Sequence, residues 1–425
     1  MNRHPPGPTL AFETRKSDRL TTWFVGAMAV AIGCLRPTYI GETQSFPVCV
    51  VLLVLEMLIL MNFYAENARL SFDKIAVGHI CLYVFIAFYV LVRTTFDRSL
   101  GDDAFKAFLI STAFLIAVAI AMSKPRYTSV FFDTFAVVII ASSASLLVTF
   151  ALVGLGAPVS SLVIVHLPNP STYGGGMGDM AFPFTHVTNE AVSWIGMAPR
   201  LAGIFREVGC FPPYACWAAV YAYMRGWSFR WPAVCLIASM LCLSTIGPLA
   251  IYTGAMLVLY RLKFRPIHAA AVVVGAGILL WPIVYTMDYV GLEQKINSGT
   301  GSYEDREWLF WAVLDTRDFL LGDGNGWSLV SSDAGINLIS QIRLFGLLYF
   351  VPVVAIYLLP IGNLEFWLSA CVPAMVTVAF SQPFAAEPTF LMIFFSVAAF
   401  AAGGGQPRRD PQAAGLVAAM RRAAL

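Results

Sequence analysis

Long apolar runs recur along almost the whole chain and constrain its fold more than any other feature. They are about 16–25 residues long, close to the ~20 residues that an α-helix needs to cross the hydrocarbon core of a bilayer. Hydrophobic residues make up 58% of the 425 residues, more than one soluble core would use. The sequence predicts an all-α integral membrane protein with about twelve transmembrane helices. The expected spans are 21–39, 45–63, 75–94, 104–122, 129–155, 206–224, 229–245, 246–262, 267–288, 334–359, 363–380 and 388–402.

The positions of lysine and arginine predict how these spans are oriented, because cationic loops stay on the cytoplasmic side of a membrane. With the N-terminus inside, most of the basic residues fall in inner loops. We therefore expect a cytoplasmic N-terminal arm at 1–20, a membrane domain at 21–402 and a cytoplasmic tail at 403–425. Two long loops, at about 156–205 and 289–333, then lie on the outer side.

Charge and cysteine usage exclude other classes of partner. The formal net charge is only +2, and the basic residues form no continuous stripe, so nucleic acid is not an expected partner. The eight cysteines include no Cys-x-x-Cys pair and have no histidine at ligand spacing. We interpret them as packing residues and expect no metal site.

A first polar cassette stands at the entrance to the predicted span 206–224. It contains Arg200, Gly203, Arg206 and Glu207. Charges at membrane depth are costly unless they face a polar cavity or one another. If 203–210 were helical, Gly203 and Glu207 would share one face and Arg206 would point elsewhere, so no i,i+4 ion pair would satisfy the segment. The alternative is that the arginines are interfacial residues whose charged ends extend to water.

A second polar cassette lies in the other outer loop. Tyr303, Asp305 and Arg306 precede the aromatic cluster 308–311, a pattern typical of an amphipathic helix at a membrane surface. The turn at 322–326 has glycine at every second position, which lets the backbone approach a ligand or a helix closely.

Asp333 begins the predicted span 334–359, where a carboxylate can cap the helix N-terminus and can also act in catalysis. Arg343 lies two to three turns deeper in that span and needs a partner, for which Glu387 and Asp333 are the candidates. The turn from Ser244 to Gly247 is interpreted as a tight reversal that supports the groove.

The loop at 156–205 is rich in glycine, especially at 173–178. This density predicts a mobile segment able to fold over a groove, with a plain linker as the alternative. The loop lacks the strand, lysine and helix arrangement of a phosphate-binding P-loop.

In order and spacing, these segments resemble the O-antigen polymerase and ligase superfamily of bacterial membrane glycosyltransferases. The shared pattern is an Arg-x-x-Gly-x-Phe-x-Glu motif, a Ser-x-x-Gly turn one span later, and an outer loop with an arginine, a Gly-x-Gly turn and an Asp-x-Gly helix start. The residues that carry it are Arg200, Gly203, Phe205, Glu207, Ser244, Gly247, Arg306, Gly322, Gly324, Asp333, Gly335 and Gly346.

The resemblance implies the glycosyltransferase C class, with a metal-independent reaction and no cofactor. Such enzymes take a glycan from undecaprenyl diphosphate at the periplasmic face of the inner membrane and pass it to an acceptor hydroxyl. By this interpretation Arg200 and Arg306 hold the diphosphate, because guanidinium groups bind phosphates bidentately. Glu207 or Asp333 would orient or deprotonate the acceptor. The residues expected to contact substrate are Arg206, Gly203, Arg343, Asp305 and Tyr303.

Ligases of this superfamily carry a histidine at the start of the helix after the large loop, where this chain has the sequence 332–335 without histidine. The difference favours a polymerase that joins lipid-linked repeat units, the donor and the acceptor both being undecaprenyl-diphosphate-linked oligosaccharides. An O-antigen ligase acting on lipid A core is one alternative, and a transporter or flippase of lipid-linked sugars is another. Membrane lipids are expected partners, and a chain-length regulator is left open.

Overall fold

The structure is a computed structural model that describes most of the chain. The described residues are 8–65, 72, 74–95, 101–168, 177–192, 198–244, 246–286, 311, 313–323, 338–339, 341–380 and 386–401. The elements of the first half are α1 (Pro8–Gly33), α2 (Tyr39–Ala65), α3 (Lys74–Thr95), α4 (Gly101–Met122), α5 (Pro125–Gly154), α6 (Val159–Leu162), β1 (Val163–Pro168), β2 (Met177–Ala181), β3 (Thr185–Val192) and β4 (Ala198–Leu201). Those of the second half are α7 (Phe211–Met224), α8 (Arg230–Leu241), α9 (Leu249–Arg261), α10 (Pro266–Thr286), α14 (Gln341–Phe345), α15 (Leu347–Leu358), η1 (Leu359–Gly362), α16 (Leu364–Phe366), η2 (Trp367–Cys371), α17 (Val372–Phe380), α18 (Pro388–Phe395) and α19 (Ala398–Ala401).

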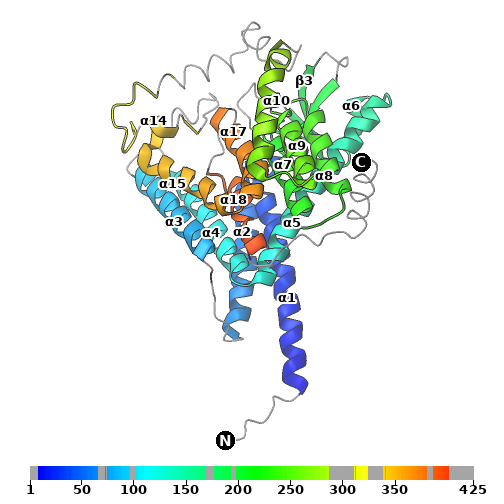
Figure 1. Ribbon diagram of the computed structural model, residues 1–425. Helices are drawn as coiled ribbons and strands as arrows, with labels where there is room; N and C mark the ends of the chain where they lie inside the picture. Colours follow the sequence, from blue (N-terminus) through cyan, green and yellow to red (C-terminus); the bar gives the residue numbers. More distant parts are fainter. Residues whose placement is uncertain are drawn as a thin grey trace, which may run out of the picture.

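The helices form a bundle that widens away from the N-terminal end of α1 (Figure 1). Helices α3, α4 and α15 lie on one side of it and α7, α8 and α9 on the other, while α18 lies between the two groups. Direct packing joins α1 to α2 and α5, α3 to α4 and α15, and α7 to α8. The wide end carries the β-strands and α14.

The short helix α18 lies at the centre of the core, and all eight of its residues are buried. Phe395 packs edge-on against Tyr83 of α3 and stacks with Phe114 of α4, and Phe394 stacks on Tyr357 of α15. Aromatic pairs in these geometries add to the stabilisation that apolar burial already provides. On the other side, Phe390 packs edge-on against Tyr214 of α7, so this late helix joins the two sides of the bundle.

Three helical stretches in the described part are long and apolar enough to cross a membrane: Gln44–Ala65, Ala76–Arg93 and Pro125–Gly154. Eight further apolar stretches of 10–17 residues accompany them. Helix α2 buries Leu52, Ile59 and Phe63 and exposes Val54 and Met57 on its other side, as expected of a helix that faces lipid. The chain is therefore compatible with a mostly helical membrane protein, and the number of twelve spans stays a prediction.

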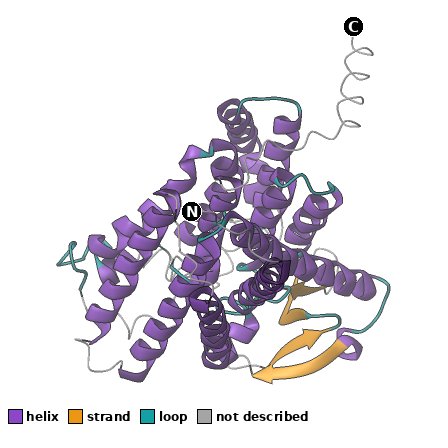
Figure 2. Cartoon of the chain, turned by 90° about the horizontal axis from the view of Figure 1, so that it is seen from below, coloured by secondary structure: helices purple, strands orange, loops and turns teal. Residues whose placement is uncertain are grey.

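The described parts of the loop predicted as a flap or linker at 156–205 form a four-stranded antiparallel sheet in the order β1-β2-β3-β4. Figure 2 shows this sheet at the edge of the helical bundle. The all-α prediction therefore missed it, because strand pairing depends on contacts between segments and the glycines of the loop concealed short strand signals. The glycine-rich residues 173–176 lie outside the described part.

Two predicted span boundaries are wrong for identifiable reasons. The span predicted at 206–224 begins as α7 only at Phe211. Prolines occupy the first turn of α7, where a backbone N–H would have no partner within the helix. The span predicted at 334–359 is interrupted at Gly346, which has a φ of +72° and separates α14 from α15. A residue with positive φ cannot continue a right-handed helix.

Candidate functional site

The first polar cassette lies where the sheet meets the helices. Arg200 is in the edge strand β4, where it pairs with Thr188 of β3. The chain leaves the strand at Ala202 and reaches α7 through a series of turns that carry Gly203, Arg206 and Glu207. These cassette residues therefore come from irregular backbone, and the helical segment considered for 203–210 does not form.

Three separate parts of the chain form hydrogen bonds to the backbone of residues 202–206. In β3, the His186 N–H donates to the Gly203 carbonyl at 2.6 Å, and the His186 carbonyl accepts from Ala202 at 2.9 Å. At the corner between α1 and α2, the Tyr39 N–H donates to Ile204 at 2.9 Å, and the Pro37 carbonyl accepts from Arg206 at 3.1 Å. The backbone that presents the two arginines is therefore fixed from both sides.

Helix α5 supplies the third support. The Ser142 hydroxyl accepts a hydrogen bond from the Ile204 N–H at 3.0 Å. Gly203 has a φ of +59°, and a Cβ at this position would collide with the Ser142 Oγ. Glycine is therefore required here both by the left-handed backbone and by the close approach to α5.

Arg206 and Glu207 form a local ion pair, with the Arg206 Nε and the Glu207 Oε1 3.9 Å apart. Their side chains are 17% and 30% exposed, so both keep access to solvent or a ligand. Between the arginines, Phe205 is fully buried and stacks on Tyr214 of α7 with ring centroids 4.6 Å apart. The aromatic contact fixes the middle of the cassette while the charged side chains stay at its surface.

The first cassette also lies near two segments that are distant in the sequence. The charge of Arg200 acts on Cys242, next to the end of α8, and the Cys242 thiol contacts the Val208 carbonyl at 3.9 Å. Tyr214 lies within electrostatic reach of both Arg206 and Glu387. The structure thus brings the first cassette close to the end of α8 and to the residue before α18.

The predicted reversal at Ser244 is confirmed. The Gly247 N–H donates to the Ser244 carbonyl at 2.9 Å, and a Cβ on Gly247 would lie only 3.0 Å from that same oxygen. Since Cys242 precedes this turn, the Ser-x-x-Gly and Arg-x-x-Gly-x-Phe-x-Glu segments are neighbours in space.

His186 is a residue that the sequence did not single out as part of the site. Its imidazole is fully buried, and its ring centroid lies 4.8 Å from that of Tyr39. Burial lowers the pKa of His186 from 6.5 to about 4, with the charge of Asp179 opposing this shift. Its only sequence signal was its position in the long outer loop, and its role follows from strand pairing.

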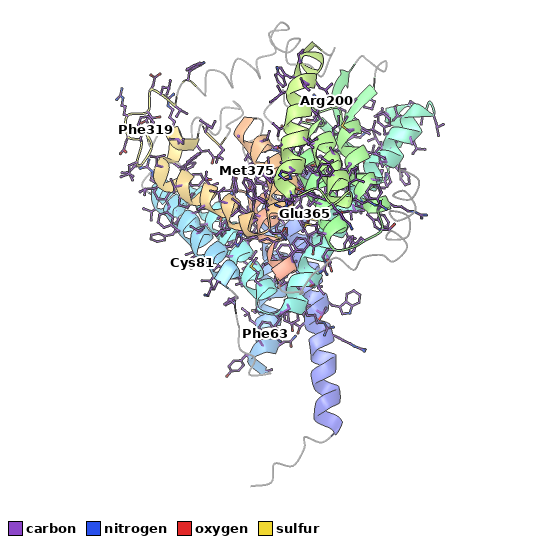
Figure 3. All side chains as sticks on the ribbon, viewed as in Figure 1. Phe63, Cys81, Arg200, Phe319, Glu365 and Met375 are labelled. Carbon is purple, nitrogen blue, oxygen red and sulfur yellow. The ribbon has the colours of Figure 1, made fainter. Side chains whose placement is uncertain are left out.

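The described part of the second cassette lies elsewhere at the wide end. Figure 3 shows Arg200 and Phe319 on opposite sides of the molecule. The Arg343 Nε lies 3.7 Å from the Asp323 Oδ2, and the Asp323 N–H donates to the Arg343 carbonyl at 2.8 Å. Asp323, which the sequence interpretation passed over, is therefore an ion-pair partner of Arg343, whereas the candidate Asp333 lies outside the described residues.

Helix α3 holds this second region in place. The Tyr89 hydroxyl lies 3.1 Å from the Leu321 carbonyl and 2.6 Å from the Phe345 carbonyl, and Arg93 donates to the Gly322 carbonyl at 3.3 Å. Gly346 packs so closely on Leu320 that a Cβ would collide with its carbonyl oxygen. Arg343 thus belongs to the short helix α14, which is held closely by neighbouring segments, and its contact with substrate stays a prediction.

Tyr303, Asp305, Arg306 and Asp333 lie outside the described residues, and their convergence with Arg200 stays a prediction. Among the described residues, no group of three histidine, cysteine or acidic side chains could hold a metal ion. No protein-family model, no curated protein and no solved structure matches the chain. The first cassette offers arginines on a fixed backbone, whose guanidinium groups suit an anion, beside a partly exposed carboxylate.

Proposed function

We propose that this chain is a membrane glycosyltransferase that polymerises lipid-linked oligosaccharides. The observation that carries the proposal is the first cassette. Arg200 and Arg206 are held on backbone fixed by β3, α5 and the α1–α2 corner, and a partly exposed Glu207 lies beside them. Arginines on a fixed backbone suit a diphosphate, because preorganised cations stabilise charge that develops on a leaving group.

In the proposed reaction an acceptor hydroxyl attacks the anomeric carbon of the donor glycan. The new glycosidic C–O bond forms as the C–O bond to undecaprenyl diphosphate breaks, and the diphosphate leaves with the electron pair. Arg200, together with Arg306, holds that diphosphate. Glu207 or Asp333 accepts the proton of the hydroxyl or orients it.

The remaining site residues have supporting roles in this proposal. Arg206 and Gly203 position the phosphates, and Tyr303 and Asp305 contact the glycan. The protein acts in the bacterial inner membrane with both termini in the cytoplasm, so the cassettes face the periplasm. This orientation follows from the distribution of basic residues along the chain.

The test is reconstitution of the purified full chain in proteoliposomes with an undecaprenyl-diphosphate oligosaccharide. We expect a ladder of longer glycans. Arg200→Lys should lower turnover about 100-fold, because a lysine loses the bidentate geometry that stabilises the departing diphosphate. Arg230→Lys, an exposed arginine at the start of α8, is the matched control and should leave turnover unchanged.

Near-normal chain growth by Arg200→Lys would rule out a diphosphate-binding role for Arg200. Transfer only to lipid A core would instead identify a ligase. Movement of the lipid-linked sugar across the membrane without any new glycosidic bond would identify a transporter.

A further inference from the structure

Three hydroxyl side chains on one face of α5 hold non-helical backbone against that helix. Ser142 accepts from the Ile204 N–H at 3.0 Å, and Ser145 accepts from the Phe184 N–H at 2.9 Å. Thr149 donates to the Phe182 carbonyl at 2.7 Å. Positions 142, 145 and 149 follow the i, i+3, i+7 spacing of a single helix face. The cassette and the turn between β2 and β3 are therefore fixed to the same side of α5.

The position of this face along α5 places it at membrane depth. Asp133 is paired with Arg225 through two hydrogen bonds of 3.0 and 2.9 Å, and residues 134–154 after it carry no charge. These 21 residues (154 − 134 + 1) span about 32 Å, the thickness of a hydrocarbon core. Thr149 then lies ~8 Å and Ser145 ~14 Å inside the C-terminal end of the helix at Gly154.

The turn between β2 and β3 presents two aromatic side chains outward at this depth. Phe182 is 52% exposed and Phe184 is 68% exposed, although the backbone between them is fixed to α5. Val148, next to Thr149 in α5, is 42% exposed, and Leu155, the residue after α5, is 85% exposed. Exposed apolar side chains suited to lipid therefore occur on the turn and on the end of α5 to which it is bound.

We propose that the Phe182–Phe184 turn is a re-entrant element whose two rings lie among the acyl chains of the bilayer. Ser145 and Thr149 satisfy two of its backbone polar groups, the Phe184 N–H and the Phe182 carbonyl, which lowers the cost of placing it in hydrocarbon. Ile204 is bound to the same face one turn deeper, so the cassette is held below the membrane surface. A ligand that carries a lipid tail reaches it from within the bilayer plane. This inference requires only that α5 spans the membrane and does not rest on the proposed reaction.

The test places 4-trifluoromethylphenylalanine at Phe184 of the full chain in nanodiscs of phosphatidylethanolamine and phosphatidylglycerol. Fluorine relaxation is measured with dissolved oxygen, which partitions into hydrocarbon, and with a water-soluble nickel chelate. The same label at Val148 is the lipid reference. The label at His166, whose side chain is 66% exposed on β1, is the water reference.

We expect the oxygen-to-nickel ratio at Phe184 to match that at Val148 and to exceed that at His166 severalfold. A ratio equal to that at His166 would place the turn in water and overturn the proposal. Protection from both agents would mean that protein covers the turn, such as a second copy of this chain, and would also overturn it. None of these outcomes depends on whether the chain polymerises glycans.

Discussion

At the scale of single residues, Gly203 is where β4 turns away from the sheet toward α7. Its positive φ and the adjacent Ser142 Oγ both exclude a side chain. We expect Gly203→Ala to lower the free energy of unfolding by about 2 kcal/mol, the usual cost of such strain. Thermal unfolding in detergent measures this. Gly154→Ala is the matched control, because no atom lies within 4 Å of its Cβ position. Equal melting temperatures for the two variants would contradict the prediction.

Burial of His186 makes the free energy of unfolding depend on pH, and the lowered pKa of the imidazole sets the direction of this dependence. Its pKa is about 4 in the fold and 6.5 as the ordinary value, so the unfolded chain binds a proton more readily. Above pH 6.5 the imidazole is neutral in both states and does not lower the free energy of unfolding. As pH falls from 6.5 toward 4, this free energy decreases by up to about 3 kcal/mol, because protonation favours the unfolded chain.

His186→Phe keeps a ring next to Tyr39 and should remove this component of acid destabilisation, measured as the change in melting temperature between pH 7 and pH 4. His268→Gln should retain it, because the His268 side chain is exposed at the start of α10, away from His186 in the sequence. An acid response in His186→Phe identical to that of the unaltered protein would count against the assignment.

The residues of the first cassette were the part of the site that the sequence located best. Charge concentrated in an apolar chain indicated Arg200, Arg206 and Glu207, and the structure holds all three on one fixed segment. His186 and Asp323 could not be found in this way. Each acquires its role from pairing with a segment distant in the sequence, which a local pattern does not encode.

At the scale of elements, the contact between α5 and α7 depends on a charged pair near one end of both helices. Asp133 accepts two hydrogen bonds from Arg225 and a third from the Tyr221 hydroxyl at 2.8 Å. Asp133→Asn should lower the free energy of unfolding by about 3 kcal/mol, because it removes the ion pair and weakens three hydrogen bonds to a charged group. Tyr221→Phe removes only one of these hydrogen bonds and should cost about 1.5 kcal/mol. Melting temperatures in detergent compare the two, and an equal loss for both would refute the larger role of the ion pair.

Helix positions followed from hydropathy, whereas the irregular elements did not. Apolar runs predicted the places of α2, α3 and α5 within a few residues, because burial in lipid or protein selects for them directly. The sheet and the break at Gly346 depend on how segments meet. In the sequence, Gly346 resembles any glycine within a helix. Only its close packing against Leu320 in the structure distinguishes it.

At the scale of the whole molecule, the distribution of basic residues makes a testable statement about orientation. Alkaline phosphatase fused after Ala157 should be active, since this position precedes the sheet on the predicted outer side. The same enzyme fused after Lys263, between α9 and α10, should be inactive, and a fluorescent protein fused there should fluoresce. The reverse pattern would mean that the cassettes face the cytoplasm.

The support that the α1–α2 corner gives to the cassette also has a consequence for biosynthesis. Tyr39 emerges from the ribosome 165 residues (204 − 39) before its hydrogen-bond partner Ile204. At ~5–20 residues per second, the corner waits roughly 8–33 s for that partner. Until then the Tyr39 N–H and the Pro37 carbonyl depend on temporary partners. A chain truncated before Ile204 therefore lacks the partners that complete the corner between its first two helices.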